Sequence, residues 1–383
     1  MMRIAIVHYW DVMDPGGINS NILKSSIKLG EMGNQVLILQ PRVSENQGGK
    51  ISESVEVICL ESPRFSPPFN YSRRFIEELK VQIENFNPQI LHIHSHMNLL
   101  SHAVIGMANR NFHSIPLVFS PHFDTSLSTK SLRLLFPLFN STIGRKSSKK
   151  IDHVIFNSNY EKRAYEKNVD MANHYSIISP GIDWNPTSRN RIWNENLNLI
   201  YCGHSIKRKR PERFVKLISS LSNSTQEMGI RIKGKFASEG PELEKCKRLA
   251  RQLGIFEDIE WLPFLRREIM IEEISNSDYF VLLSDSEAYG ISVAEAISLG
   301  TPVIISNNTA LSEFSTNDGV ILVDNPDHLG PTVQEILSMR GTSIRVGATE
   351  ETNIVSWQSM ADKLLKIFEE SVNLSKNHKN LGR

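Results

Sequence analysis

The chain has 383 residues, with 43 lysines and arginines against 42 aspartates and glutamates and a formal net charge of +1. This length suggests two domains, and the 40% hydrophobic and 22% charged residues are typical of a globular protein. The balanced charge argues against nucleic acid as a partner, because neutralising phosphates needs a surplus of cations. No apolar run approaches the ~20 residues that span a bilayer, and three cysteines without a C-x-x-C spacing favour free thiols in a reducing compartment. We therefore expect a cytoplasmic protein, and contact with a membrane surface is left open.

The first half of the chain alternates apolar runs with segments of helical spacing. Ile4–Val7 is followed by a loop that ends in Gly16-Gly17, then by a helix that ends at Gly33 and by a second run, Val36–Leu39. Further strands of this series are expected at 90–93, 116–119 and 154–156. Apolar strands that alternate with helices predict a parallel sheet covered on both faces.

A polar stretch at residues 184–196 lacks an apolar period and is the predicted linker. A second series of strands follows, expected at 197–201, 230–232, 259–262, 279–283, 302–305 and 320–323. The expected fold class is therefore α/β, with two doubly wound, Rossmann-like domains at 1–183 and 197–356. They are expected to face each other across a ligand cleft at the carboxyl ends of the strands.

Residues 279–305 carry the most informative pattern. A buried strand, a loop with Glu287 and Gly290, and a helix that contains Glu295 follow one another. A helix N-terminus binds phosphate or a hydroxyl through its backbone N–H groups, and a glycine there lets a ligand approach closely. Two interpretations stay open: the glutamates bind a ligand, or Ser292-x-x-Glu295 is a capping box and Glu287 is a solvated loop residue.

A cluster of four cations, residues 207–210, precedes a helix expected to begin near Pro211. Cations at the positive end of a helix are unfavourable unless an anion binds there or the side chains extend into water. A diphosphate would compensate them. A solvated basic turn is the alternative.

The run Glu287-Ala-Tyr-Gly-Ile-Ser-Val-Ala-Glu295, followed by Gly300-Thr-Pro-Val, resembles the E-x7-E signature of the family-4 retaining glycosyltransferases, which have the GT-B fold. The resemblance extends over nearly the whole chain. Further matching positions are Gly16-Gly17, His92-Ile-His94, His122, the turn 179–183, Lys209, and the helix from Trp357, which in this family crosses back onto the first domain (about 357–383).

The resemblance implies a donor site mainly in the second domain. Lys209 would bind the donor diphosphate beside Gly203, and Glu295 would hold the nucleotide ribose. Glu287, with the backbone of Tyr289, Gly290 and Ile291, would contact the transferred sugar.

The first domain and one departure from the family pattern complete the implied site. Gly16 and Gly17 would let the first domain close over the phosphates, and His122 would face the sugar near the reacting carbon. The family usually has arginine directly after Gly203, where this chain has His204. A histidine can donate to phosphate but lacks the bidentate fork of arginine.

The implied reaction transfers a hexose-type sugar, with retention of configuration, from a UDP- or GDP-sugar to a glycan, a glycolipid or a small molecule. The favoured family mechanism is front-face attack, in which the leaving phosphate helps to deprotonate the acceptor. No Asp-x-Asp suited to a metal-bound nucleotide is present, Asp285-Ser-Glu287 being the nearest pattern. We therefore expect no metal and no other cofactor.

Three other functions are weighed against this one. His92, His94 and His96 alternate, so a strand would place them on one face, and with His122 and Asp124 they suggest a metal-dependent hydrolase. His204 motivates a partner subunit that binds a nucleotide sugar without catalysis. A GT-B epimerase acting on the nucleotide sugar is the third.

Residues 129–150 mix apolar positions with a basic end and have two interpretations. The favoured one is a core-packed helix that breaks near Pro137 and leads into a solvated basic loop. The alternative is contact with an anionic membrane.

Overall fold

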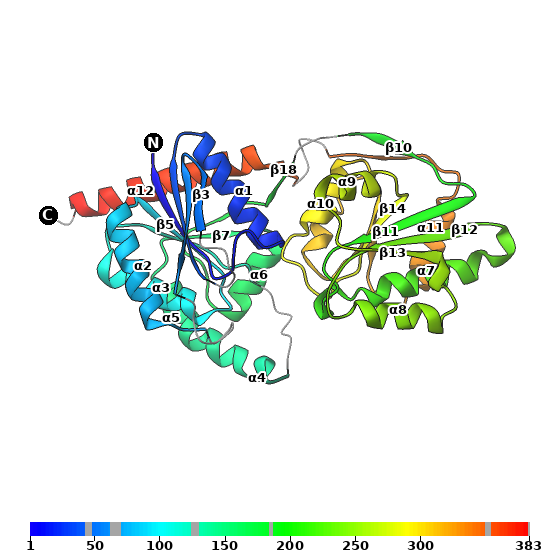
Figure 1. The fold of residues 1–383 in the computed structure, drawn as a ribbon, viewed down its shortest axis with the longest axis horizontal. Helices are drawn as coiled ribbons and strands as arrows, with labels where there is room; N and C mark the ends of the chain where they lie inside the picture. Colours follow the sequence, from blue (N-terminus) through cyan, green and yellow to red (C-terminus); the bar gives the residue numbers. More distant parts are fainter. Residues whose placement is uncertain (43–47, 62–69, 124–129, 184–186, 349–353, 382–383) are drawn as a thin grey trace. The chain divides into compact units, whose positions relative to one another are not determined.

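The computed structural model of the chain describes residues 1–42, 48–61, 70–123, 130–183, 187–348 and 354–381 (Figure 1). These residues divide into two compact units. The first unit is Met1–Gly181 with Val355–Arg383, and the second is Ile182–Ile354.

The first unit is built on an eight-stranded sheet in the order β3-β4-β2-β1-β5-β6-β7-β8. All neighbours in this sheet pair in parallel except β3 and β4, which are antiparallel. The strands are β1 (Arg3–Val7), β2 (Gln35–Pro41), β3 (Gly48–Ser52), β4 (Val55–Leu60), β5 (Ile90–His94), β6 (Leu117–Ser120), β7 (His153–Phe156) and β8 (Tyr175–Ile177).

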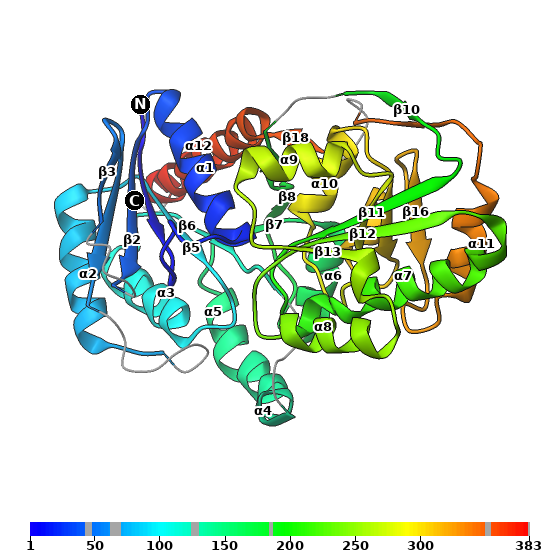
Figure 2. The same ribbon diagram turned by 45° about the vertical axis from the view of Figure 1, so that its right-hand side comes forward.

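Helices cover both faces of this sheet (Figures 1 and 2). On one face α1 packs against the C-terminal helix α12, and on the other α3 packs against α2 and α5. The helices are α1 (Gly17–Glu31), α2 (Arg73–Phe86), α3 (Leu99–Asn111), α4 (Lys130–Phe139), the π-helical turn η1 (Asn140–Gly144), α5 (Arg145–Ser148), α6 (Asn159–Asn168) and α12 (Trp357–Leu381).

The second unit has a six-stranded, wholly parallel sheet in the order β13-β12-β11-β14-β15-β16. Its strands are β11 (Asn196–Cys202), β12 (Arg231–Ala237), β13 (Ile259–Leu262), β14 (Tyr279–Leu282), β15 (Val303–Ser306) and β16 (Val320–Val323). Helices α9 and α10 pack together, as do α7 with α8 and α11. The helical segments are η2 (Lys207–Lys209), α7 (Glu212–Thr225), η3 (Gln226–Met228), α8 (Leu243–Gln252), η4 (Phe256–Asp258), α9 (Arg267–Ser275), α10 (Ile291–Ser298), η5 (Ala310–Phe314) and α11 (Gly330–Ser338).

The apolar runs form strands because their side chains are buried on both faces. Every residue of β14 and β15 is buried, as parallel strands require when helices cover both faces of the sheet. Each unit has its own hydrophobic core. The predicted fold class, two doubly wound α/β units, is confirmed.

The expected linker, residues 184–196, is structured where it is described. Residues 187–196 belong to the second unit, in which β10 (Arg189–Arg191) pairs antiparallel with β17 (Ile344–Val346). Trp193 is 4% exposed and is part of the core. A polar two-stranded ribbon has no apolar period, so the sequence pattern resembled that of a linker.

The chain leaves the first unit and returns to it close to a small two-stranded sheet of β9 (Gly181–Ile182) and β18 (Val355–Ser356). Beyond β18, α12 packs on the first unit, and the rings of Phe368 and His92 lie 5.5 Å apart. Phe368 is fully buried. The C-terminal helix therefore completes the first unit.

The helix expected to break near Pro137 does not break there. Helix α4 includes Pro137 and continues through η1 into α5, so the predicted basic loop is helical. A proline removes one backbone hydrogen bond from a helix. The helix persists because Phe136 and Asn140, on either side of the proline, are buried.

In the described part of the chain, none of the helices combines the length and the apolar composition that a membrane crossing needs. Cys59, Cys202 and Cys246 are buried free thiols.

Truncation of the buried ring in α12 tests the role of this helix. We expect Phe368→Ala to lower the free energy of unfolding of the first unit by about 3–5 kcal/mol, because it leaves a cavity beside β5. Leu374→Ala, at a half-exposed position of the same helix, should change it by less than about 0.5 kcal/mol. Urea denaturation followed by circular dichroism measures both, and equal effects would contradict this account of α12.

Candidate active site

The strand order of the second sheet fixes where its functional side chains gather. β11 lies between β12 and β14. From β11 the chain adds β12 and β13 on one side, and it then adds β14, β15 and β16 on the other side. The strand order therefore switches sides between β11 and β14, although all the strands are parallel. Ligands of doubly wound sheets bind at this switch point, beyond the carboxyl ends of the strands. The loop 203–206 follows β11, and the loop 283–290 follows β14.

A partly buried ion pair joins η2, which follows the first of these loops, to Glu287 in the second. Lys209 Nζ lies 3.1 Å from Glu287 Oε1, and Arg208 Nη1 lies 3.7 Å from Glu287 Oε2. The Ser284 hydroxyl donates to Glu287 Oε1 at 3.1 Å. Burial alone would raise the pKa of Glu287, but Lys209, Arg208 and the hydrogen bonds hold it below its usual value. Glu287, 8% exposed, is therefore a buried carboxylate kept ionised by its neighbours.

Two other cations of this region are balanced by carboxylates. Arg210 pairs with Glu212, Asp285 and Asp327, and the buried Arg213 pairs with Asp285 and Asp327. Arg213 also donates to the carbonyl of Leu283. Within the cluster 207–210, Arg210 is thus compensated by these carboxylates, Arg208 and Lys209 by Glu287, and Lys207 is exposed. Compensation by carboxylates of the chain itself is a third possibility beside the bound anion and the solvated turn.

Gly203 follows the end of β11 and lies next to Lys209. Its φ of 149° lies in a region that side chains rarely adopt, and a Cβ there would lie 3.7 Å from Lys209 Nζ. His204 follows and stacks on the ring of Phe264, with the centroids 5.2 Å apart. Its imidazole occupies the position at which the resemblance expects arginine.

Helix α10 begins directly at the loop that carries Glu287. Gly290 precedes it with a φ of 105°, and a Cβ there would collide with the Leu311 side chain. No side chain caps this helix, and the amides of Val293 and Ala294 already donate to the carbonyl of Gly290. The backbone N–H groups of Ile291 and Ser292 are therefore the ones that can bind an anion or a hydroxyl. Tyr289 is buried and packs on Phe314, which fixes the loop.

Glu295 is 6% exposed and lies on α10. Its Oε1 pairs with Arg267 Nη1 at 2.8 Å, and Arg267 Nε pairs with Asp183 at 2.7 Å. Burial raises the pKa of Glu295, although Arg267 acts in the opposite direction. The capping-box interpretation is wrong, because α10 starts at Ile291 after Gly290 and Ser292 therefore lies inside the helix.

The first sheet has a switch point of its own between β1 and β5. His8 follows β1 and bonds through Nε2 to Asn19 Oδ1 at 2.8 Å. Asn19 lies in the first turn of α1, which begins at Gly17 after Gly16. The two glycines thus start the helix whose first turn supports His8.

His122 follows β6 and lies beside the same edge. Its Nδ1 is 3.1 Å from Asn157 Nδ2, and its Nε2 is 2.9 Å from His94 Nδ1. Burial lowers the pKa of His122 to about 3. The ring is therefore neutral at pH 7, and both of its nitrogens are engaged.

The expected alignment of three histidines on one face is wrong. β5 ends at His94, and Ser95 has a φ of 76°, so the chain turns out of the strand. His92 bonds to Ser120, whereas His96 bonds to Asn140 and lies among aromatic rings. Within the described residues, no three His, Cys, Asp or Glu side chains are placed to hold a metal ion. Asp124 lies outside the described residues.

The predicted site residues form two groups, each within one unit. The second unit holds Gly203, His204, Lys209, Glu287, Tyr289, Gly290, Ile291 and Glu295, and the first holds Gly16, Gly17 and His122.

Sequence reasoning missed several partners of these residues. Arg267 has no motif that would mark it. Asn157 and Glu161 follow β7, and Glu161 accepts hydrogen bonds at 2.7 Å from the backbone amides of Phe123 and Asn157. The spacing Ser158-x-x-Glu161 is that of a capping box, and the Ser158 hydroxyl does accept from the amide of Glu161. That spacing could have identified the start of α6.

Comparison with known proteins gives relatives along most of the chain. Residues 187–352 match Glycosyl transferases group 1, and residues 15–185 match Glycosyltransferase Family 4. A D-inositol 3-phosphate glycosyltransferase of Corynebacterium glutamicum is 23% identical over 94% of this chain and 93% of its own length. A GDP-mannose-dependent alpha-(1-6)-phosphatidylinositol dimannoside mannosyltransferase of Mycobacterium tuberculosis is 25% identical over 44% of this chain and 42% of its own.

Solved structures share the fold. Sucrose-phosphate synthase from Thermosynechococcus elongatus superposes with a TM-score of 0.75 at 16% identity, covering 97% of this chain and 99% of its own. Anabaena HepE, in complex with UDP and glucose, gives a TM-score of 0.64 at 13% identity, covering 98% and 99%.

The two family matches follow one another along most of the chain, and its two doubly wound sheets are those of the GT-B structures that it resembles. The chain therefore belongs to the family-4 glycosyltransferases, the glycosyl transferases group 1, with the GT-B fold.

Proposed function

We propose that this glycosyltransferase moves a hexose-type sugar, with retention of configuration, from a nucleotide-diphosphate sugar to a glycan, glycolipid or small-molecule acceptor. The observation that carries the proposal is the Lys209–Glu287 pair at the switch point of the second sheet, beside the uncapped start of α10. A cation and a helix N-terminus there suit a diphosphate, and a buried carboxylate suits sugar hydroxyls.

Each site residue has a part in this proposal. Lys209 binds the diphosphate beside Gly203 and His204, and Glu295 holds the nucleotide ribose. Glu287 contacts the sugar together with the backbone of Tyr289, Gly290 and Ile291. Gly16, Gly17 and His122 are the contributions of the first unit.

The chemistry asks mainly for electrostatic stabilisation. The departing diphosphate gains negative charge while the sugar carbon becomes oxocarbenium-like, and a fixed cation and helix dipole favour that change. In the proposed front-face mechanism the leaving phosphate takes the acceptor proton. Metal is not part of the proposal, since Asp285 and Glu287 of the nearest Asp-x-Glu pattern are already engaged with Arg213 and Lys209.

UDP- and GDP-sugars are the proposed donors. The Anabaena protein is described in complex with UDP and glucose, and the mycobacterial relative is named as GDP-mannose-dependent. The names of the relatives include both an inositol phosphate and a phosphatidylinositol dimannoside. We therefore keep both small-molecule and lipid-linked acceptors.

Contact with an anionic membrane surface is part of the proposal for a lipid-linked acceptor. Leu135, Leu138 and Ile143 are 48%, 62% and 38% exposed along α4 and η1. Leu135 and Leu138 are three residues apart in α4, and Ile143 follows in η1; we call these three exposed side chains the apolar stripe. Lys146 and Lys149 follow as exposed cations. An apolar stripe flanked by lysines is typical of a helix that lies on anionic lipid.

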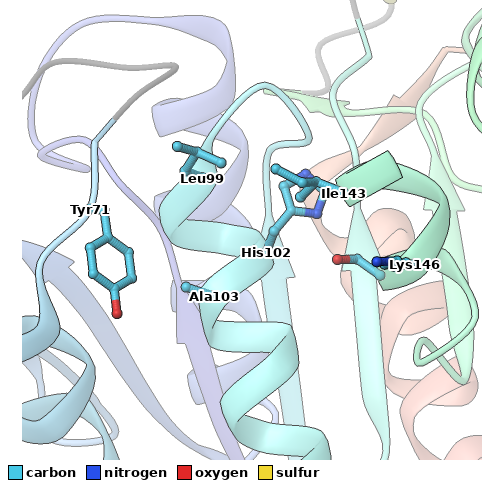
Figure 3. A pocket seen from close by; sticks show the side chains of 7 residues that line it. Tyr71, Leu99, His102, Ala103, Ile143 and Lys146 are labelled. Carbon is cyan, nitrogen blue, oxygen red and sulfur yellow. The ribbon is translucent and has the colours of Figure 1, made fainter. Parts of the chain in front are cut away.

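An open cavity of about 310 Å³ continues this stripe. In Figure 3 Tyr71 lies on one side of it, residues of α3 lie in the middle, and Ile143 and Lys146 lie on the other side. The lining is largely apolar and includes Leu99, His102, Ala103 and Ser147.

The function is tested with a panel of UDP-, GDP-, ADP- and dTDP-sugars, with and without EDTA, by following nucleotide release and sugar products. We expect release from a UDP- or GDP-sugar that EDTA does not change. If a nucleotide sugar binds but no nucleotide is released, even after inositol phosphate or a lipid-linked acceptor is added, the non-catalytic subunit is favoured. Epimerised donor would favour the epimerase. Bound metal with chelator-sensitive hydrolysis would favour the hydrolase.

Substitution of the diphosphate-binding lysine tests the site. We expect Lys209→Ala to weaken nucleotide-sugar binding about 10- to 100-fold, because a charge-assisted hydrogen bond worth about 1.5–3 kcal/mol is lost. Isothermal titration calorimetry measures the affinity. Lys207→Ala removes an exposed cation of the same turn and should leave it nearly unchanged. Equal affinities of the two variants would remove Lys209 from the site.

Vesicle co-sedimentation tests the membrane contact. We expect the protein to bind phosphatidylglycerol vesicles, more weakly at high salt, and Leu138→Glu to lower the bound fraction several-fold by placing a charge in the apolar stripe. Leu253→Glu, at an exposed leucine of the second unit, is the matched control. If both variants bind like the wild type, α4 and η1 do not contact the bilayer.

A further inference from the structure

Two buried histidines occupy neighbouring positions at the switch point of the first sheet. β1 and β5 pair in parallel with Val7 opposite Ile93, so His8 and His94 come next on the two strands. Their rings lie edge to face with centroids 6.2 Å apart, and they are 1% and 4% exposed. His8 Nδ1 and His94 Nε2 are buried and have no hydrogen-bond partner among the described residues.

The hydrogen bonds around His8 fix its tautomer. Asn19 Nδ2 donates to the carbonyl of Asp14 at 3.0 Å, so its Oδ1 is the atom that faces His8. That oxygen can only accept, and His8 Nε2, 2.8 Å away, therefore carries the proton. The unpartnered Nδ1 of the neutral ring is then a lone-pair acceptor.

Hydrogen bonds that link Asn157, His122 and His94 fix the tautomer of His94, so that its unpartnered nitrogen is a donor where that of His8 is an acceptor. Asn157 Nδ2 donates to His122 Nδ1, so the proton of His122 is on Nε2 and is donated to His94 Nδ1. His94 therefore carries its own proton on Nε2, the unpartnered atom. Burial lowers the pKa of His8 to about 4, of His122 to about 3 and of His94 well below its usual value, so all three rings are neutral at pH 7.

The geometry points to a hydroxyl-binding site formed by His8 Nδ1 and His94 Nε2, in which a sugar hydroxyl donates to His8 and accepts from His94. A hydroxyl is both donor and acceptor, which matches an unpartnered acceptor and an unpartnered donor on two rings whose centroids are 6.2 Å apart. Buried polar atoms without partners are costly, so a ligand that satisfies both is favoured. The site rests on the proposed function, because the hydroxyl belongs to the donor sugar or to the acceptor.

This assignment gives His122 and Asn157 a positioning role. Both ring nitrogens of His122 are engaged, so it acts through His94, whose proton it fixes on Nε2. Glu161 supports the arrangement, because it accepts from the backbone amides of Phe123, next to His122, and of Asn157. Asn157→Asp should reverse the tautomers, since a carboxylate can only accept from His122 Nδ1.

Histidine-selective ¹⁵N NMR of the full chain tests the site directly. We expect the ligand-free protein to show a protonated Nε2 for both His8 and His94, and Asn157→Asp to move the His94 proton to Nδ1. Addition of the nucleotide sugar that the panel identifies, or of inositol phosphate as an acceptor probe, should shift the His94 Nε2–H signal. The nucleotide alone should not shift it, and the ligand that does shift it identifies the source of the hydroxyl.

Variants supply the second readout. His94→Phe keeps a ring but removes the donor, and we expect transfer to fall at least about tenfold while binding of the nucleotide alone is unchanged. His153→Asn, a half-buried histidine at the start of β7 bonded to Ser176, should transfer normally.

The two hypotheses can fail separately. If the wild type turns over the donor but no sugar shifts the His94 signal, the hydroxyl site is overturned and the transferase proposal stands. The two unpartnered nitrogens would then have another partner, such as a buried water. Absence of both donor turnover and signal shift would overturn the two together. If His94→Phe does not fold, the tautomer shift in Asn157→Asp still decides the hydrogen-bond assignment.

Discussion

Parallel strands that are buried on both faces leave polar side chains one place to meet a ligand, which is the carboxyl edge of the sheet. Both sheets of this chain obey that constraint. In the second unit the loops after β11 and β14 bring Lys209 to Glu287, and in the first the residues after β1 and at the end of β5 bring His8 to His94. In each sheet the strand order switches sides at this pair of strands, and the crevice at the switch point makes room for these side chains.

The polar groups buried at the carboxyl edges of the two sheets are stabilised in different ways: by ion pairs in the second unit and by hydrogen bonds between neutral side chains in the first. In the second unit the charges around β11 and β14 are compensated in place: Glu287 by Lys209, Arg213 by Asp285 and Asp327, and Glu295 by Arg267. In the proposed function, an incoming diphosphate would therefore compete with Glu287 for Lys209, and binding would exchange one partner of this cation for another. Fixed cations of this kind stabilise developing charge without reorganising.

Sequence patterns predicted the parts of this structure that depend on local rules. The apolar runs became strands, Gly33 and Gly300 end α1 and α10 in the left-handed region, and α7 begins next to Pro211. The errors arose where tertiary contacts decide. The ribbon at 189–191 is polar but paired, Pro137 stays within a helix anchored by buried neighbours, and Ser95 turns His96 away from the strand face.

The same distinction separates the site residues from their partners. The spacing Glu287-x7-Glu295 is local, so the pattern was visible in the sequence, whereas Arg267 reaches Glu295 only through the packing of α9 on α10. Asn157 reaches His122 across β6 and β7 in the same way. Such pairs carry no sequence period, and a single sequence cannot reveal them.

The hydrogen-bond chain in the first unit shows what these long-range partners add. A neutral imidazole has one donor and one acceptor, and the role of each nitrogen is fixed by the bond that the other one makes. Asn19 fixes the tautomer of His8 so that its unpartnered nitrogen is an acceptor. Asn157, acting through His122, fixes the tautomer of His94 so that its unpartnered nitrogen is a donor. Two identical residue types thereby become one acceptor and one donor. In the proposed function this arrangement would discriminate between a hydroxyl and an ion, because neither neutral ring offers a charge, whereas the cations of the second unit would bind the phosphates.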